Sequence, residues 1–238
     1  MSQDKKLNLS NRKRALLRKL QQQQGLNTEA TQPIPQRKTE EKTVLSSAQE
    51  WMWLLEQLSP SVYNNPLTFK LTGQLNHRAL EKAINEIVNR HEALRTKFPL
   101  TDGKPQPFIN PLSHYSLLMV EVASEIEAKE SAIAHTKHPF NLEKEFPWRA
   151  ILFRLSNTEH WLHLTIHHIV DDDRSRFIWL EELTKLYEAF CENRPSPLAE
   201  LPIQYGDFAL WQRSQLQGEN YQQLLNYWQQ QLADLPPA

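Results

Sequence analysis

The stretch HWLHLTIHHIVDDDRSR, residues 160–176, decides how this chain is interpreted. Its first half alternates: Leu162, Leu164 and Ile166 would lie on one face of a strand, and the residues between them on the other. One step further, His167 and His168 point to opposite sides of the strand end, so one imidazole can be held in the structure while the other faces a cavity. Three consecutive aspartates follow, and then a helical pattern.

The residue types leave three interpretations of this segment open. In the first, the histidines are satisfied polar groups and the aspartates form a solvated turn that caps the next helix. In the second, His163, His167, His168 and the aspartates bind a metal ion, although a strand would divide those histidines between two faces. In the third, one histidine is a general base, suited to proton transfer by a free pKa of about 6.5, and Asp172 orients the site by an ion pair.

Strands and helices are interspersed along the rest of the chain, which predicts an α/β or α+β fold. Asn76 can cap a helix, and the turn 156–158 joins two strands. The residue patterns predict helices over 46–58, 124–135, 176–191, 207–216 and 219–232, and strands over 67–71, 117–122, 148–155 and 160–166.

The first 43 residues differ from the rest in composition. They hold ten Lys and Arg against four Asp and Glu, whereas the whole chain has a net charge of −1. Residues 1–26 are predicted to form a basic, amphipathic helical arm and residues 27–43 a flexible linker, so the body is expected over 44–238. The arm lacks interleaved aromatic residues, and neither nucleic acid nor a membrane is an expected partner.

The single cysteine, Cys191, excludes a disulfide framework within the chain and zinc sites built on several thiolates. The polar, basic first residues do not resemble a signal peptide, and no apolar run is long enough to span a bilayer. A cytoplasmic location is the expectation that follows.

Five segments resemble motifs of the condensation domains of nonribosomal peptide synthetases, and they follow one another along the chain in the same order as in that family. RHEALRTKF (90–98) matches the second motif of that family, and HHIVDDDRS (167–175) stands where the family has HHxxxDGxS. YGDFALWQ (205–212) resembles YxDFAxWQ. LSSAQEWMWLLEQL (45–58) and HPFNLEKEFPWRAIL (138–152) resemble two further family segments. This resemblance implies a chloramphenicol-acetyltransferase-like lobe, with a mixed sheet flanked by helices.

The resemblance also implies a site and its partners. His168 would be the base, or would position the acceptor amine, and His167 would be mainly structural. Asp172 would form a salt bridge, with Arg95 favoured over Arg90, and Ser175 matches the motif serine. No cofactor or metal is expected to bind directly. The substrates would arrive as thioesters on the phosphopantetheine arms of peptidyl carrier proteins.

Three departures from the family pattern affect what the chain can do. Asp173 replaces the motif glycine, and its carboxylate would project beside His168 and oppose both base catalysis and a developing oxyanion. Trp51 and Asn141 replace charged residues that the family often has. The second lobe is expected to be absent. The chain would then be an acyltransferase-type half, inactive alone and completed by another chain or by a second copy, or a non-catalytic truncated remnant or interaction module.

Overall fold

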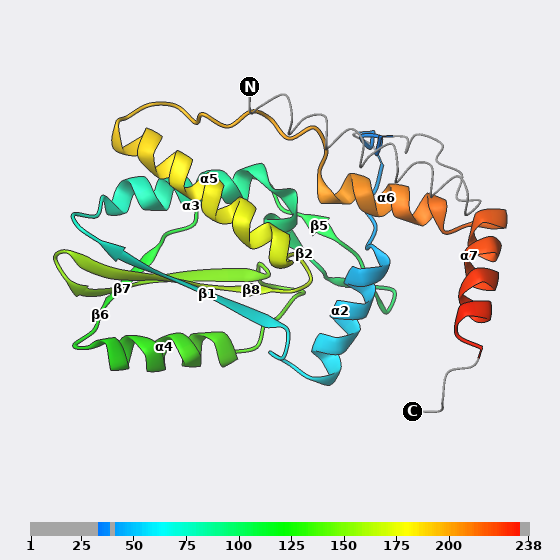
Figure 1. The fold of residues 1–238 in the computed structure, drawn as a ribbon, viewed down its shortest axis with the longest axis horizontal. Helices are drawn as coiled ribbons and strands as arrows, with labels where there is room; N and C mark the ends of the chain where they lie inside the picture. Colours follow the sequence, from blue (N-terminus) through cyan, green and yellow to red (C-terminus); the bar gives the residue numbers. More distant parts are fainter. Residues whose placement is uncertain (1–32, 39–40, 234–238) are drawn as a thin grey trace, which may run out of the picture. The chain divides into compact units, whose positions relative to one another are not determined.

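The two predicted strands around residue 157 form the centre of a four-stranded sheet (Figure 1). β7 (Trp148–Ser156) and β8 (Glu159–His167) make an antiparallel hairpin. β1 (Asn64–Thr72) pairs antiparallel with β8, and β6 (Leu118–Glu121) pairs parallel with β7, so the order is β1-β8-β7-β6. The sheet is therefore mixed, as the resemblance implies.

The face of the sheet that carries Leu162, Leu164 and Ile166 packs against two helices, α3 (His77–Arg90) and α5 (Asp173–Cys191). The Asn76 side chain caps α3 by accepting a hydrogen bond from the backbone N–H of Ala79, as predicted. The apolar stripes of both helices pack against the sheet and form one hydrophobic core with it. The two helices contribute Ala79, Leu80, Ala83, Ile84, Ile87, Val88, Trp179, Leu183, Leu186, Ala189 and Phe190. Burial of this surface is the main driving force for assembling this layer.

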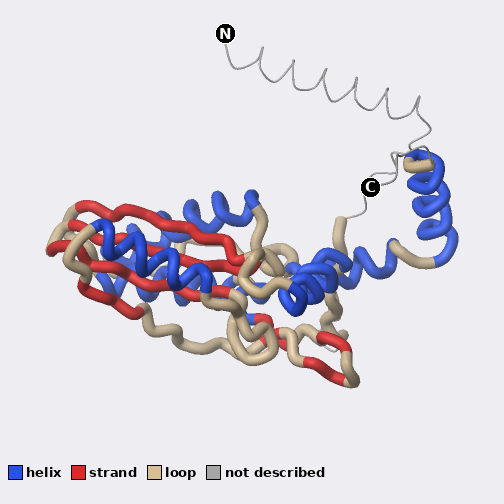
Figure 2. The backbone as a smooth tube through the Cα atoms, turned by 90° about the horizontal axis from the view of Figure 1, so that it is seen from below, coloured by secondary structure: helices blue, strands red, loops and turns tan. Residues whose placement is uncertain are grey.

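The opposite face of the sheet is covered by α4 (Glu125–Lys137), which begins at the N-cap Ser124. Ala128 and Ala132 of this helix pack with Phe153 and Val122 in a smaller apolar cluster. Figure 2 shows the strands lying between helices. The predicted arrangement of a mixed sheet flanked by helices is thus confirmed.

The elements around the end of β8 are shorter. They are α2 (Ser47–Leu58), the 3-10 helix η1 (Glu92–Arg95), the strand pairs β2 (Thr96–Lys97) with β5 (Phe108–Ile109) and β3 (Leu100–Thr101) with β4 (Lys104–Pro105), α6 (Tyr205–Gln215) and α7 (Gly218–Gln231). A tight turn joins β3 to β4, and Asp102 and Gly103 both have positive φ there. The sequence patterns did not predict η1 or the strands β2, β3, β4 and β5, because two- to four-residue elements carry no periodicity.

The computed structural model describes residues 33–38 and 41–233. The predicted helical arm and the first part of the predicted linker lie outside these residues. Residues 35–238 form one of two structural units, and the contacts of the candidate site lie within it. Among the described helices, none is long and apolar enough to cross a membrane.

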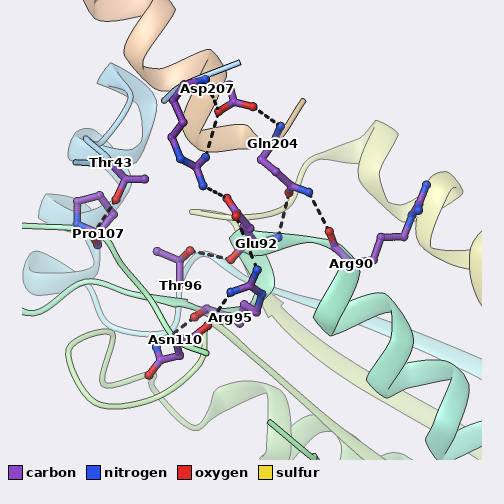
Figure 3. A network of polar contacts seen from close by, with 10 residues as sticks. Thr43, Arg90, Glu92, Arg95, Thr96, Pro107, Asn110, Gln204 and Asp207 are labelled. Carbon is purple, nitrogen blue, oxygen red and sulfur yellow. Dashed lines mark hydrogen bonds and ion pairs between the residues drawn. The ribbon is translucent and has the colours of Figure 1, made fainter. Parts of the chain in front are cut away.

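The last part of the predicted linker is anchored to the body. Arg37 Nη2 lies 2.5 Å from Glu92 Oε2 in η1, and Arg37 Nη1 lies 3.1 Å from Asp207 Oδ1 in α6. Figure 3 labels these two acidic partners, Glu92 and Asp207. Gln204 extends this network by donating to the backbone carbonyl of Arg90 at 3.0 Å. A Cβ atom on Gly206 would stand 2.8 Å from Arg37 Nη1, so the absence of a side chain at that position gives the guanidinium its space.

Candidate functional site

His167, the last residue of β8, is fully buried and has a partner at each ring nitrogen. Its Nδ1 accepts a hydrogen bond from the backbone N–H of Ile169 at 3.0 Å, and its Nε2 lies 3.2 Å from Glu56 Oε2 in α2. With Nδ1 accepting, Nε2 carries the proton and donates to the carboxylate. Burial lowers the pKa of His167, and Glu56 opposes that shift. His167 therefore ties the strand end to α2 as a neutral imidazole.

His168 follows the strand and has an exposed side chain. Its backbone N–H donates to the carbonyl of Tyr63 at 2.9 Å, which continues the pairing of β8 with the chain just before β1. Its ring nitrogen Nδ1 lies 3.2 Å from the amide nitrogen of Asn65. The two histidines thus differ as the alternation predicts: one is enclosed, and the other is accessible with its Nε2 free of protein partners among the described residues.

Asp171 is a buried carboxylate, 7% exposed, between the histidines and α5. Its Oδ2 accepts from Asn65 Nδ2 at 3.3 Å and from Arg176 Nε at 3.4 Å. Burial raises the pKa of Asp171, and the pairing with Arg176, the Asn65 hydrogen bond and the nearby His168 oppose this shift. One amide nitrogen, that of Asn65, is therefore shared between Asp171 and His168.

Asp172 is the N-cap of α5, so the predicted salt bridge between Asp172 and Arg95 is wrong. Asp172 Oδ1 accepts from the backbone N–H of Ser175 at 2.7 Å and from its hydroxyl at 2.6 Å. These hydrogen bonds lower the pKa of Asp172. Arg95 instead donates to the carbonyl of Asn110 at 2.6 Å and lies 3.7 Å from Glu92. The helix α5 starts at residue 173, earlier than the predicted 176. Asp172 is therefore the N-cap residue, and its carboxylate binds the first turn of α5 and not Arg95.

Within the described residues, the Asp173 carboxylate makes no hydrogen bond or ion pair with His168, beside which the departure from the motif placed it. It is the first residue of α5, its side chain is 96% exposed, and its carboxylate lies 3.8 Å from Arg176 Nη1. Its φ is not positive, so aspartate meets no backbone strain here. An acidic residue in the first turn also suits the helix dipole. The carboxylates whose pKa values the nearby His168 lowers are those of Asp171 and Asp172.

A cavity of about 170 Å³ opens next to this loop. Its walls come from the RHEALRTKF segment, from the end of β8 and the start of α5, and from Tyr205 of α6; the lining residues include Leu94, Ile166, Val170, Asp171, Ser175 and Trp179. Tyr205 is held by a 2.9 Å hydrogen bond between its hydroxyl and that of Ser46. Three of the segments that resemble the family, 90–98, 167–175 and 205–212, therefore line one apolar recess beside the histidine loop.

The geometry of His163 is that of a structural group. Its Nδ1 lies 2.8 Å from the hydroxyl of Thr68, and its ring packs edge-on against His135 at 5.2 Å. Burial lowers the pKa of both histidines to about 4. Within the described ranges, no group of three or more His, Cys, Asp or Glu side chains has the arrangement of a metal site.

Sequence reasoning missed three residues of this arrangement: Glu56, Asn65 and Asp171. Glu56 lies inside a segment singled out for its apolar positions, and nothing in the sequence indicates that it is 3% exposed. Asn65 could have been found from the strand register, because it stands opposite Ile166 and thus shares the face of His168. Asp171 was grouped with its two neighbours as one acidic turn.

Comparisons with known proteins show what the chain as a whole is similar to. The family model described as "Condensation domain" matches residues 39–238. A linear gramicidin synthase protein of Brevibacillus parabrevis is 36% identical over 226 residues, which are 92% of this chain and 3% of that protein. Chondramide synthase cmdD of Chondromyces crocatus is 39% identical over 203 residues, 81% of this chain and 5% of that protein. The chain thus spans a few per cent of the length of these relatives.

Solved structures give the same fold. The X-domain in the complex of the X-domain and OxyB from teicoplanin biosynthesis superposes with a TM-score of 0.79 at 29% identity, over 85% of this chain and 46% of that one. The first condensation domain of the calcium-dependent antibiotic synthetase, in complex with a substrate analogue, gives a TM-score of 0.72 at 24% identity, over 83% and 49%. The region matched to this chain is about half of the length of each of these two solved chains.

Proposed function

The chain belongs to the condensation-domain family, and we propose that it supplies one half of a site that joins two carrier-bound thioesters by an amide bond. The amine of an aminoacyl acceptor attacks the carbonyl carbon of an acyl donor. The new C–N bond replaces the donor's C–S bond, and the proton lost by the amine ends on the thiol of the departing phosphopantetheine arm. No cofactor of the chain's own takes part, since the arms only carry the substrates.

The single observation that carries this proposal is the contrast between the two histidines. His167 is enclosed with both ring nitrogens engaged. His168 is exposed with Nε2 available among the described residues, and the loop that it begins continues into Val170 and Asp171, which line the apolar recess. We assign contact with the reacting groups to His168, as base or as the group that positions the amine, and a structural role to His167. Asp172 and Ser175 shape the loop by capping α5.

A polypeptide limited to residues 1–238 would need a second half for this chemistry. The support is that the matched chains of known structure are about twice as long as the matched region, which covers 46% and 49% of them. The missing wall would come from further sequence, another chain or a second copy. Peptidyl carrier proteins would be the partners that deliver both substrates.

The test is a complementation assay. Residues 1–238 are fused to the second half of a condensation domain from the linear gramicidin synthase relative, and a panel of acyl and aminoacyl groups is loaded on donor and acceptor carrier proteins. Intact-mass spectrometry of the acceptor carrier then reports transfer. We expect a product with the fusion and none with residues 1–238 alone. Turnover by residues 1–238 alone would contradict the need for a second half, and no transfer by any folded fusion would contradict the function.

A non-catalytic interaction module is the second candidate. The observation in its favour is the likeness to the X-domain, whose structure is a complex with another protein, OxyB. This candidate predicts that the chain binds a protein partner while the fusion transfers no acyl group to any acceptor carrier. The complementation assay therefore separates the two candidates.

A further inference from the structure

Asn65 stands between a buried carboxylate and the accessible histidine. Its amide nitrogen Nδ2 lies 3.3 Å from Asp171 Oδ2 and 3.2 Å from His168 Nδ1. The residue comes from β1, far from the histidine loop in sequence, and the register places it opposite Ile166, on the face that His168 also uses. The reaction proposed for the site uses neither Asn65 nor Asp171.

The carboxylate determines which way the Asn65 amide points. An ionised carboxylate only accepts hydrogen bonds, and of the two ends of the amide only the nitrogen donates. Asp171 therefore selects the orientation with Nδ2 toward itself, and Arg176 helps to hold the carboxylate in place at 3.4 Å. The second hydrogen of the same nitrogen is then directed at His168 Nδ1.

This orientation sets the tautomer of His168. A ring nitrogen that faces an N–H donor must be the unprotonated one, so in the neutral imidazole the proton sits on Nε2. We propose that Asn65 and Asp171 are positioning residues that hold His168 as the Nε2–H tautomer, presenting a hydrogen-bond donor and not a free lone pair to the reacting groups.

The consequence rests on the proposed function: it keeps the contact of His168 with the reacting groups and replaces the role of base or amine-positioning group by that of a hydrogen-bond donor. A donor at Nε2 can bind the oxygen of the thioester carbonyl, where negative charge develops as the amine attacks. It cannot be the first acceptor of the amine proton without changing tautomer. His168 then acts by electrostatic stabilisation, and the amine proton passes to the departing thiol by way of solvent.

The test measures the tautomer directly on the full chain, without substrate. Long-range proton–nitrogen spectra of histidine-labelled protein at pH 8, where an unperturbed imidazole of pKa about 6.5 is neutral, distinguish protonated from unprotonated ring nitrogens. His168→Gln assigns the signal. We expect the Nε2–H form to dominate roughly tenfold, which corresponds to one hydrogen bond of about 1.4 kcal/mol. A dominant Nδ1–H form would overturn the proposal.

Two variants separate positioning from a merely structural role. Asn65→Asp combined with Asp171→Asn exchanges donor and acceptor, keeps the bridge and should invert the tautomer to Nδ1–H. Asn65→Leu removes the bridge and should give a mixture of both forms. Unchanged His168 signals in either folded variant would contradict the proposal. Asp173→Asn, which alters the exposed neighbouring carboxylate, is the matched control and should change nothing, and the His163 signals report that the fold is intact.

The outcome is independent of the complementation assay. If the tautomer behaves as expected and the fusion makes no amide, the positioning by Asn65 and Asp171 stands and the proposed function fails. If the fusion works and the tautomer is Nδ1–H, the function stands and the donor role of His168 fails.

Discussion

The carboxylate of Glu56 lies 3.2 Å from Nε2 of His167, and both side chains are buried, at 3% and 0% exposure. The same carboxylate accepts from the backbone N–H of Ser61. This contact joins α2 to the end of β8, immediately before the residue that we assign to the chemistry. Its energetic weight can be measured.

Glu56→Ala should lower the free energy of unfolding by about 2–4 kcal/mol, because it leaves the buried Nε2–H of His167 without an acceptor and removes packing. Glu56→Gln keeps an acceptor oxygen and should cost less than half as much. Urea unfolding followed by circular dichroism gives both values. Equal costs for the two variants would mean that the hydrogen bond to His167 contributes nothing.

Asp172 and Arg95 should behave as independent sites. Asp172→Ala removes the N-cap of α5 and should cost about 0.5–2 kcal/mol. Because Arg95 has other partners, Asn110 and Glu92, the cost should be the same within about 0.5 kcal/mol in an Arg95→Ala background. A larger coupling in this double-mutant cycle would restore the ion pair that the family resemblance implied.

Gly206→Ala should destabilise the chain through Arg37. The new methyl group would stand 2.8 Å from Nη1 and displace a guanidinium that pairs with Glu92 and Asp207. We expect a loss of about 1–2 kcal/mol in the wild-type background and a smaller loss in an Arg37→Ala background, where the contact with Arg37 is gone and the 3.2 Å contact with Thr43 Cγ2 remains. Equal losses in both backgrounds would show that Arg37 does not occupy this space.

Stability should fall as the pH drops from about 6.5 to about 4. Burial lowers the pKa of His135 and His163 to about 4 in the folded chain, whereas in the unfolded chain they titrate near 6.5. In that window the unfolded chain binds more protons, so protonation favours unfolding. The two rings together should cost on the order of 2–4 kcal/mol, after discounting for partial solvation.

His163→Gln should reduce this slope by about half or more, since one of the two titrating rings is gone and His135 also loses the charge repulsion of His163 that helps to lower its pKa. His114→Gln is the matched control, because the side chain of His114 is 67% exposed. Denaturant titrations at several pH values measure the slopes. An unaltered slope in His163→Gln would place the acid sensitivity elsewhere.

Periodicity was sufficient to predict the layers of the fold. The alternation around Leu164 predicts β8, and the stripe ending at Val88 predicts α3, because a core face must repeat with the period of its own element. The opposite placement of His167 and His168 follows from the same alternation. Their accessibility in the structure agrees with it.

The partners of the loop carboxylates could not be predicted in this way. Whether Asp172 caps a helix or pairs with Arg95 depends on where α5 begins, and helix ends are the least determined part of any pattern. The bridge from Asp171 to His168 depends on Asn65, which lies more than a hundred positions earlier in the chain. Such contacts are set by sheet register and not by local sequence.

We expect the side chain of His168 to contact the reacting groups when a second half completes the condensation site. The most direct measurement is the single-turnover rate of amide formation by the fusion of residues 1–238 with a second half, comparing His168→Gln with the surface control His114→Gln. We predict a loss of about 10²-fold or more for His168→Gln and no change for His114→Gln. Amide formation by His168→Gln at the wild-type rate would contradict this role.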